Sequence, residues 1–251
     1  MAMVRRQKAV IAALVLYWPT LFVLAHIPIP EVVRRADVSD KSLHVLMYMI
    51  LTFLLWSALK PQSKTNWRHL APWLTLAVVL VYALCDEYLQ RFVAGRSMDA
   101  HDLVADVVGA VAALVVVSIF SFWPALLIVT ATTIYTLAVF TRANLTELLP
   151  VTSTLFHLGT YSFFTLQWIA CLRSKFAIRR PDRRWLGMSL IAPLSLLLIT
   201  KASALISGKA FEGWDIVAAA VGVLGTVTIW SILARPRANR ANRPELSGAE
   251  V

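Results

Sequence analysis

Apolar residues dominate this chain in long runs, and short polar segments separate the runs. Each run is close to the roughly 20 residues that an α-helix needs to cross the apolar core of a bilayer. The spans predicted from these runs fall in eight ranges: 8–27, 43–60, 70–90, 102–121, 123–140, 154–172, 185–206 and 214–234. The pattern therefore predicts an all-α fold, a polytopic membrane bundle of about eight transmembrane helices.

Composition and charge support a membrane protein and indicate its orientation. Of the 251 residues, 59% are hydrophobic and 15% are charged, which leaves too little polar surface for a soluble domain. The net charge is +10, and Lys and Arg gather at the N-terminus, in the second and sixth connections and in the tail 235–251. The positive-inside rule then predicts that both termini lie in the cytoplasm. Because topology explains the charge, no nucleic-acid partner is expected.

Two smaller features concern the ends of the helices. The first span has the basic start and apolar middle of a signal peptide, but no small-residue cleavage site follows it, so we interpret it as a retained span. Cys85 and Cys171 fall near opposite ends of their helices, so no disulfide is expected between them. The basic tail 235–251 is expected to be disordered.

An internal repeat organises the eight spans. The segments HVLMY (44–48) and HLGTY (157–161) are 113 positions apart, and the same offset pairs Asp102 with Asp215 and Gly109 with Gly222. Matched His, Tyr, Gly and acidic positions at one offset indicate a duplication. We therefore predict two parallel four-helix repeats, at 1–120 and 121–234, related by an axis along the membrane normal.

One polar interval, DEYLQRFVAGRSMDAHDLVADVVG at 86–109, lies between two apolar runs. Ionisable residues inside a membrane protein are functional candidates by default. Helical spacing places polar residues of the second, third and fourth spans at the outer end of the bundle. The predicted ligand-binding set is His44, Tyr48, Glu87, Gln90, Arg96, Asp99, Asp102 and Asp106.

Three motifs carry a resemblance to a known family: DKSLHVLMY (40–48), DEYLQ (86–90) and GRSMDAHDLVADVVG (95–109). In this order and spacing they resemble the VanZ-like family of bacterial membrane proteins, over roughly residues 8–120. The resemblance implies a multi-pass protein of the bacterial inner (cytoplasmic) membrane, part of the cell envelope and associated with resistance to a lipidated glycopeptide antibiotic. Position 106 departs from the family, because it holds Asp where the family usually has Asn.

The second repeat separates chemical from structural candidates. It has Thr200, Ser203 and Ala219 at the positions of Glu87, Gln90 and Asp106, so a bundle can be built without those three polar groups. Glu87, Gln90 and Asp106 therefore carry the functional hypothesis. The alternative for Glu87 is a salt bridge to Arg91 or Arg96 that only anchors the helix end.

The remaining candidates have structural alternatives. Asp102 and Asp215 start helices, where N-capping competes with a ligand role. Gly109 and Gly222 are better explained by close helix packing. His44 and its counterpart His157 could each be satisfied by a hydrogen bond between helices.

Three functions remain in order of preference. The first is non-enzymatic binding of an amphiphile, either a membrane lipid or a lipid-linked envelope molecule, at the outer leaflet. The second is an intramembrane enzyme acting on a lipid headgroup, with Glu87 or Asp106 as base and His44 as its partner. The third is a transporter, which would need acids at the membrane midplane. His44, His101, Glu87 and Asp106 could in principle form a metal site. No cofactor and no metal are predicted, however, because zinc-type ligand spacing and Gly-rich phosphate loops are missing.

Overall fold

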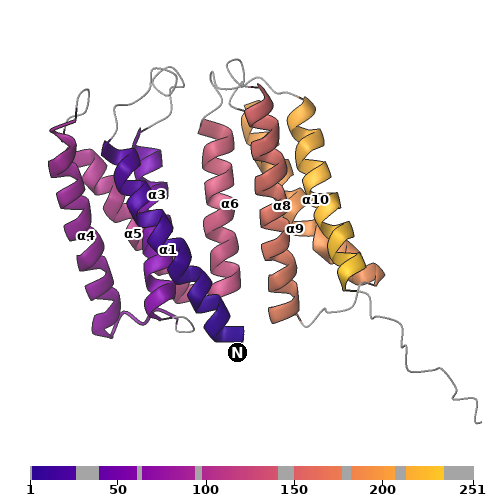
Figure 1. The fold of residues 1–251 in the computed structure, drawn as a ribbon, viewed down its shortest axis with the longest axis horizontal. Coiled ribbons are helices and arrows are strands. Elements are labelled where there is room, and N and C mark those ends of the chain that lie inside the picture. The colour runs from indigo at the N-terminus through magenta and orange to yellow at the C-terminus, as the bar shows by residue number, and fades with distance from the viewer. Residues whose placement is uncertain are drawn as a thin grey trace, which may run out of the picture.

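The computed structural model describes residues 2–26, 40–60, 64–93, 98–140, 150–176, 182–206 and 213–234. Within these ranges the chain forms eight α-helices, which stand side by side as a bundle (Figure 1), and no strand. They are α1 (Ala2–His26), α3 (Asp40–Leu59), α4 (Leu70–Gln90), α5 (Ala100–Ile119), α6 (Phe122–Phe140), α8 (Pro150–Lys175), α9 (Arg183–Ile206) and α10 (Gly213–Leu233). Each of the eight predicted spans falls on one of these helices, so the all-α fold is confirmed.

Most of these helices have the length and composition of membrane spans. Six of the described helices, α1, α3, α4, α5, α9 and α10, are long and apolar enough to cross a bilayer. The apolar helix α6 is shorter over its described side chains, Phe122–Ala138. The remaining helix, α8, is long enough but carries polar residues such as His157 and Gln167. The chain is thus a helical membrane bundle.

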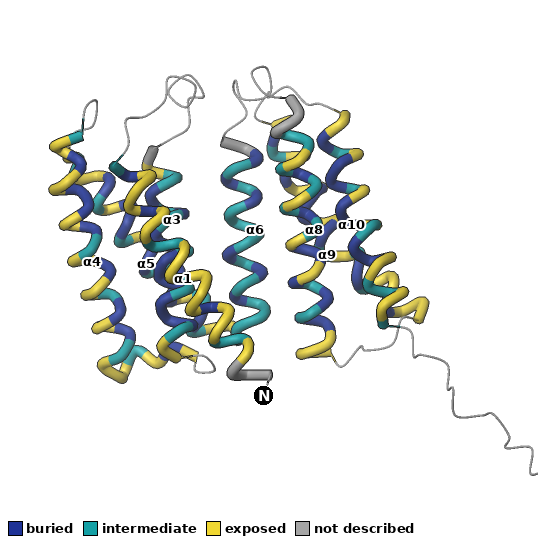
Figure 2. The backbone as a smooth tube through the Cα atoms, viewed as in Figure 1, coloured by how far each residue is buried: buried dark blue, intermediate teal, exposed yellow. Residues whose placement is uncertain are grey.

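The outer surface of the bundle is apolar. Exposed positions recur along the helices (Figure 2), and they include large hydrophobic residues such as Leu16 at 72% exposed, Leu198 at 70% and Val104 at 61%. Monomeric soluble proteins rarely expose contiguous apolar surface on this scale, whereas lipid tails cover it without cost. The polar residues that are buried therefore lie inside the protein, away from lipid.

Two glycines allow two helix pairs to approach closely. A Cβ at Gly109 on α5 would overlap the backbone carbonyl of Val45 on α3. A Cβ at Gly222 on α10 would lie 2.6 Å from the carbonyl oxygen of Leu158 on α8. Small residues at such crossings let helix backbones pack against each other inside a membrane. The packing role predicted for both glycines is confirmed.

The bundle has a separate apolar core in each half. Met49, Phe53 and Trp56 of α3 pack on Ala113 and Leu114 of α5 in the first half, which comprises α1, α3, α4 and α5. The second half comprises α6, α8, α9 and α10, and its core holds the side chains Tyr161, Phe164, Ala219 and Val223. One face of α6 also joins the first core through Ala125 and Val129. The two halves therefore share α6 as their contact.

Charge is divided between the two ends of the bundle. Most Lys and Arg residues of the described helices and connections lie at the end marked by the N-terminus in Figure 1, whereas Lys41, Arg91 and Lys201 lie toward the other end. Those at the N-terminal end are Arg5, Arg6, Lys8, Lys60, Lys64, Arg68, Arg173, Lys175, Arg183 and Arg184. The carboxyl end of α4 and the first turns of α3 and α5 lie at the opposite end. The positive-inside rule assigns the end that is richer in Lys and Arg to the cytoplasm. The cytoplasmic placement of the termini stays a prediction. The tail 235–251 lies outside the described residues.

Both cysteines are free thiols, Cys85 exposed and Cys171 buried, as expected.

Candidate functional site

The site begins at the first turn of α5. Asp99 is the N-cap of this helix, because its backbone is extended and its carboxylate accepts a hydrogen bond of 2.8 Å from the backbone N–H of His101. Such caps satisfy one of the helix's otherwise unpaired N–H groups. Hydrogen bonds from the backbone N–H and the ring of His101, and one from Lys41, hold the pKa of Asp99 well below its usual range. The prediction that Asp102 is the cap was wrong, because Asp102 lies within the first turn.

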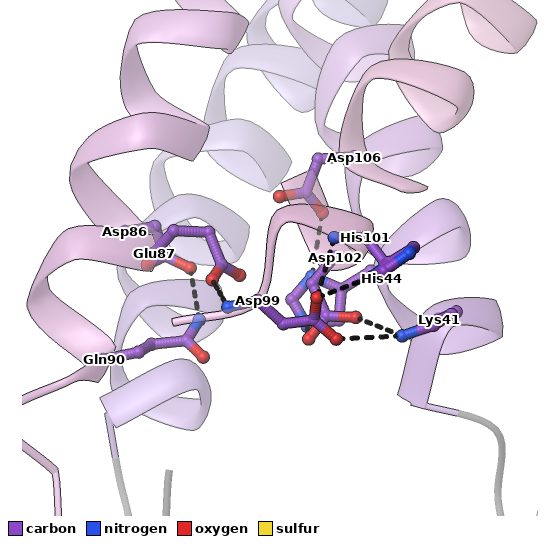
Figure 3. Close-up of polar contacts among 9 residues, drawn as sticks. All are labelled: Lys41, His44, Asp86, Glu87, Gln90, Asp99, His101, Asp102 and Asp106. Atoms are coloured by element: carbon purple, nitrogen blue, oxygen red, sulfur yellow. Dashed lines mark hydrogen bonds and ion pairs between the residues drawn. The ribbon is translucent and has the colours of Figure 1, made fainter. Parts of the chain in front are cut away.

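A lysine on α3 closes the outer edge of the site. The ammonium of Lys41 donates to Asp99 Oδ2 at 3.1 Å and to Asp102 Oδ1 at 3.2 Å (Figure 3). The Lys41 side chain is 51% exposed and that of Asp99 39%, whereas that of Asp102 is only 9% exposed. These three residues form the rim of the site. Lys41 was missing from the predicted set, although its position one turn before His44 on the same helix face could have indicated it.

The centre of the site is a buried histidine between two aspartates of α5. The Nδ1–H of His44 donates to Asp106 Oδ1 at 2.8 Å, and His44 Nε2 lies 3.9 Å from Asp102 Oδ2 (Figure 3). His44 is 3% exposed and Asp106 is 1% exposed. The hydrogen bond between helices that was an alternative for His44 is therefore present.

Glu87 of α4 completes the buried centre. It is 1% exposed, and its Oε2 accepts a 3.1 Å hydrogen bond from the backbone N–H of Asp99. The predicted alternative was a salt bridge from Glu87 to Arg91 or Arg96. The Arg91 guanidinium instead donates to the Tyr88 hydroxyl and covers its ring, and Arg96 lies outside the described residues. Ligand atoms of His44, Glu87 and Asp106 all lie within 4.8 Å of one another. We call these three residues the buried triad.

Two oxygen atoms of the buried triad have no hydrogen-bond partner among the residues that the structure describes. They are Oε1 of Glu87 and Oδ2 of Asp106, and the hydroxyl of nearby Tyr48 on α3 is also buried without a partner. Buried polar atoms without a partner are rare in folded proteins, because each carries a desolvation cost that nothing offsets. The triad therefore offers two buried carboxylate oxygens that a bound ligand could contact.

The other predicted site residues lie at the margin of the triad or beyond the described residues. Gln90 is buried, but its amide donates to Asp86 Oδ2 at 2.9 Å, one turn earlier on α4 (Figure 3). Asp86 was missed in the sequence, although the spacing of four places it on the Gln90 face. Its Oδ1 also lies 3.7 Å from His26 Nδ1 of α1. Arg96 lies outside the described residues, so its predicted role stays a prediction.

The second half of the bundle repeats part of this geometry. His157 Nε2 lies 3.9 Å from Asp215 Oδ2, the same separation as between His44 and Asp102. Thr200 stands 113 positions after Glu87, and there its hydroxyl pairs with the Tyr161 hydroxyl at 2.9 Å. Ala219 stands 113 positions after Asp106 and is fully buried. The second half thus keeps the histidine and one carboxylate but has no carboxylate at the other two positions.

A separate apolar groove lies between the halves. Its volume is about 490 Å³, and α1, α3, α6 and α8 line it with residues such as Phe53, Phe122 and Phe163. Arg6 lines it as well and covers the Phe122 ring at 4.5 Å. None of the predicted site residues lines this groove. The polar site and the groove are therefore distinct features.

Comparison with known proteins identifies the first half. The family model of VanZ/LLP1 matches residues 9–121, which include α3, α4 and α5 and every described residue of the site. Comparison with the curated proteins and with the solved structures gives no match. The matched range holds the three motifs that resemble the VanZ-like family, and the structure places them around one buried cluster. Residues 9–121 of this helical membrane bundle therefore match the VanZ/LLP1 family, and this part of the chain is VanZ-like.

Proposed function

We propose that this protein binds an amphiphile of the cell envelope, a lipid or a lipid-linked molecule. Its polar headgroup would lie at the rim of Lys41, Asp99 and Asp102 and be held by the buried polar residues beneath the rim, Glu87, Gln90 and Asp106. The observation that carries the proposal is the position of the rim. It joins a buried polar cluster to the surface at the end of the bundle opposite most of the described basic residues. The outer leaflet is where the positive-inside rule would put this end.

The surface beside the rim suits the apolar part of such a molecule. Near the carboxyl end of α4, Tyr88 is 47% exposed, Leu89 38% and Phe92 68%. Met98, next to the Asp99 cap, is 53% exposed. A ligand with a polar head and apolar tails would contact the rim and this surface together. Aromatic residues at the membrane surface commonly serve such mixed contacts.

The comparison of the halves supports a role in binding over a role in folding. The second half packs its helices with Thr200 of α9 and Ala219 of α10, both buried, where the first half has Glu87 and Asp106. The buried acids are therefore not a requirement of this packing. Buried ionisable residues of membrane proteins are retained chiefly where they serve a ligand or a pathway.

Native mass spectrometry of the purified protein tests the proposal. The protein would be incubated in mild detergent with a polar lipid extract, and in a second sample with teicoplanin as a lipidated glycopeptide probe. We expect the wild type to retain an adduct of defined mass. Glu87→Ala, Gln90→Ala and Asp106→Ala should each weaken it about tenfold or more, about 1.4 kcal/mol in binding free energy. Thr200→Ala and Ser203→Ala, the matched changes in the second half, should leave it unchanged.

The proposal fails if the three site variants are folded and hold the same adducts as the wild type. Circular dichroism and size-exclusion profiles of each variant would establish folding. An equal loss in the matched second-half variants would also contradict it, because it would place the binding surface elsewhere.

A second candidate function is catalysis on the headgroup, favoured by one contact. His44 and Asp106 share a buried hydrogen bond of 2.8 Å, the arrangement of a general acid–base pair, and Glu87 lies beside them. The same incubations would report it as new lipid species that accumulate with time and vanish in His44→Gln. Transport ranks below both, because the buried acids of the described residues lie near helix ends rather than at mid-bundle.

A further inference from the structure

We propose that the buried triad of His44, Glu87 and Asp106 binds one divalent transition-metal ion, of the class of Zn²⁺ or Mn²⁺. Three helices contribute one ligand each, α3 the imidazole and α4 and α5 the carboxylates. The proposal concerns the same site as the proposed function, but it does not require an amphiphile. It replaces the expectation of no metal that the sequence pattern favours.

The spacing of the three groups fits a metal site. Protein nitrogen and oxygen ligands bind such ions at about 2.0–2.2 Å, so neighbouring ligands of one ion lie about 3–3.5 Å apart. The ligand atoms of the triad are within 4.8 Å of one another, and His44 Nδ1 and Asp106 Oδ1 are 2.8 Å apart. Small side-chain rotations would therefore bring all three onto one ion.

The unpaired oxygens give the second and independent indication. Within the described part of the chain, Oε1 of Glu87 and Oδ2 of Asp106 are buried without a hydrogen-bond partner, and both residues are 1% exposed. Two carboxylates buried this close together repel each other unless a cation or proton lies between them. A divalent ion bound to Glu87, Asp106 and His44 would balance both charges and give these oxygens a partner.

The residues that contact the triad hold its side chains in a fixed orientation, as the residues around metal ligands do in known metal sites. Metal-binding histidines usually turn their second ring nitrogen toward a carboxylate, which fixes the ring. Asp102 Oδ2 lies 3.9 Å from His44 Nε2, and Lys41 holds Asp102 from the outside. On binding, the ion takes the place of the Nδ1 proton of His44, which is released, and the Nε2–H then faces Asp102. Glu87 is held through its other oxygen by the backbone N–H of Asp99.

The donor set selects the class of ion. Ca²⁺ and Mg²⁺ are bound mainly by oxygen atoms, and Cu⁺ prefers sulfur ligands. One imidazole nitrogen with two carboxylates suits Zn²⁺, Mn²⁺ or a similar first-row ion. Three protein ligands also leave coordination positions open, as in metal sites that bind a further molecule.

The second half provides a built-in comparison. It keeps the histidine and carboxylate pair of His157 and Asp215 at 3.9 Å. Thr200 and Ala219 stand where two carboxylates would be needed, so this half offers no such triad among its described residues. A change at His157 is therefore a matched control for the same change at His44.

Metal titration of the purified full-length protein tests the proposal. The protein in detergent would be stripped with EDTA, exchanged into metal-free buffer and titrated with ZnCl₂ and MnCl₂ by calorimetry. Bound metal per chain would be counted by inductively coupled plasma mass spectrometry. Co²⁺ absorption bands would report nitrogen and oxygen ligands. We expect about one ion per chain in the wild type and in His157→Gln. In His44→Gln, Glu87→Gln and Asp106→Asn we expect binding at least about tenfold weaker.

Two results would overturn the proposal. One is a wild type that takes up no stoichiometric ion after stripping and reloading. The other is binding by the folded Glu87→Gln and Asp106→Asn variants equal to that of the wild type, which would locate the ion elsewhere. These two variants keep the size of the native side chains, so they remain informative if His44→Gln does not fold. The titration contains no added lipid, so its failure is distinct from failure of amphiphile binding.

Discussion

Replacing Gly109 with alanine is expected to destabilise the bundle more than any other single methyl group added to a described helix. The new Cβ would overlap the carbonyl oxygen of Val45 and crowd the backbone nitrogen of Met49, so α3 and α5 would have to separate. Rigid backbone atoms cannot give way as a side chain can. Overpacking of this kind costs about 1–3 kcal/mol, and we expect the upper part of that range. Reversible unfolding in detergent with increasing SDS would measure it.

Gly225→Ala is the control for this prediction. A Cβ at Gly225 on α10 would meet no atom of the described residues within 4 Å, so the change should be neutral or slightly stabilising. Gly222→Ala should fall between the two, because one of its two near neighbours is the movable side chain of Ser162. Equal stability of Gly109→Ala and the wild type would show that α3 and α5 do not pack as described.

Replacing His44 with leucine is the second change with a large expected effect. It removes the donor to Asp106 Oδ1 and leaves a buried carboxylate with neither of its oxygens paired. Removing one partner of a buried ionic pair destabilises proteins by about 3–5 kcal/mol. We expect about 3 kcal/mol for His44→Leu in protein stripped of metal, at the lower end of that range. The same SDS unfolding series would measure it.

A double-mutant cycle checks the reason for this effect. His44→Leu with Asp106→Leu removes both partners, so most of the lost stability should return. His157→Leu is the matched change in the second half. It should lower the stability less, because the ring of His157 donates to a backbone carbonyl rather than to a carboxylate. Asp215 would still accept a hydrogen bond from the hydroxyl of Ser153. Additive effects of the two single changes in the cycle would contradict the pairing of His44 with Asp106.

The fold was largely predictable because hydrophobic length is the strongest signal in a membrane protein. A run such as 70–90 must satisfy its backbone hydrogen bonds within one helix, and the observed α4 has these same bounds. Helix ends were less predictable, since they depend on caps such as Asp99 rather than on hydropathy. The expected eight helices are present, and the polarity of α8 explains why it lacks the hydropathy of the other long helices.

The site was predicted in outline but not in its pairing. Helical spacing placed His44, Glu87 and Asp106 at one end of three spans, and the structure brings them together. Spacing within one helix cannot show which side chains meet across helices. For that reason the link between Lys41 and Asp102 and the pairing of Gln90 with Asp86 were missed.

The predicted duplication is in keeping with several paired contacts but stays a prediction. Gly109 faces the carbonyl of Val45, and Gly222 faces the carbonyl of Leu158, which is 113 positions after Val45. His44 lies 3.9 Å from Asp102, and His157 lies 3.9 Å from Asp215. The second pair stands 113 positions after the first. Superposition of the two halves in an experimental structure would test it, with equivalent helices overlapping at this one offset.

The central claim is that the buried acids serve a ligand rather than the fold, and the melting temperature of Glu87→Gln tests it most directly. Protein stripped of metal and lipid would be compared with the wild type by differential scanning fluorimetry. Glutamine keeps the oxygen that accepts from the Asp99 N–H and removes a negative charge from beside Asp106. We predict a melting temperature equal to or above that of the wild type. A fall of more than about 3 °C, about 1 kcal/mol for a chain of this size, would contradict the claim, because Glu87 would then stabilise the empty fold.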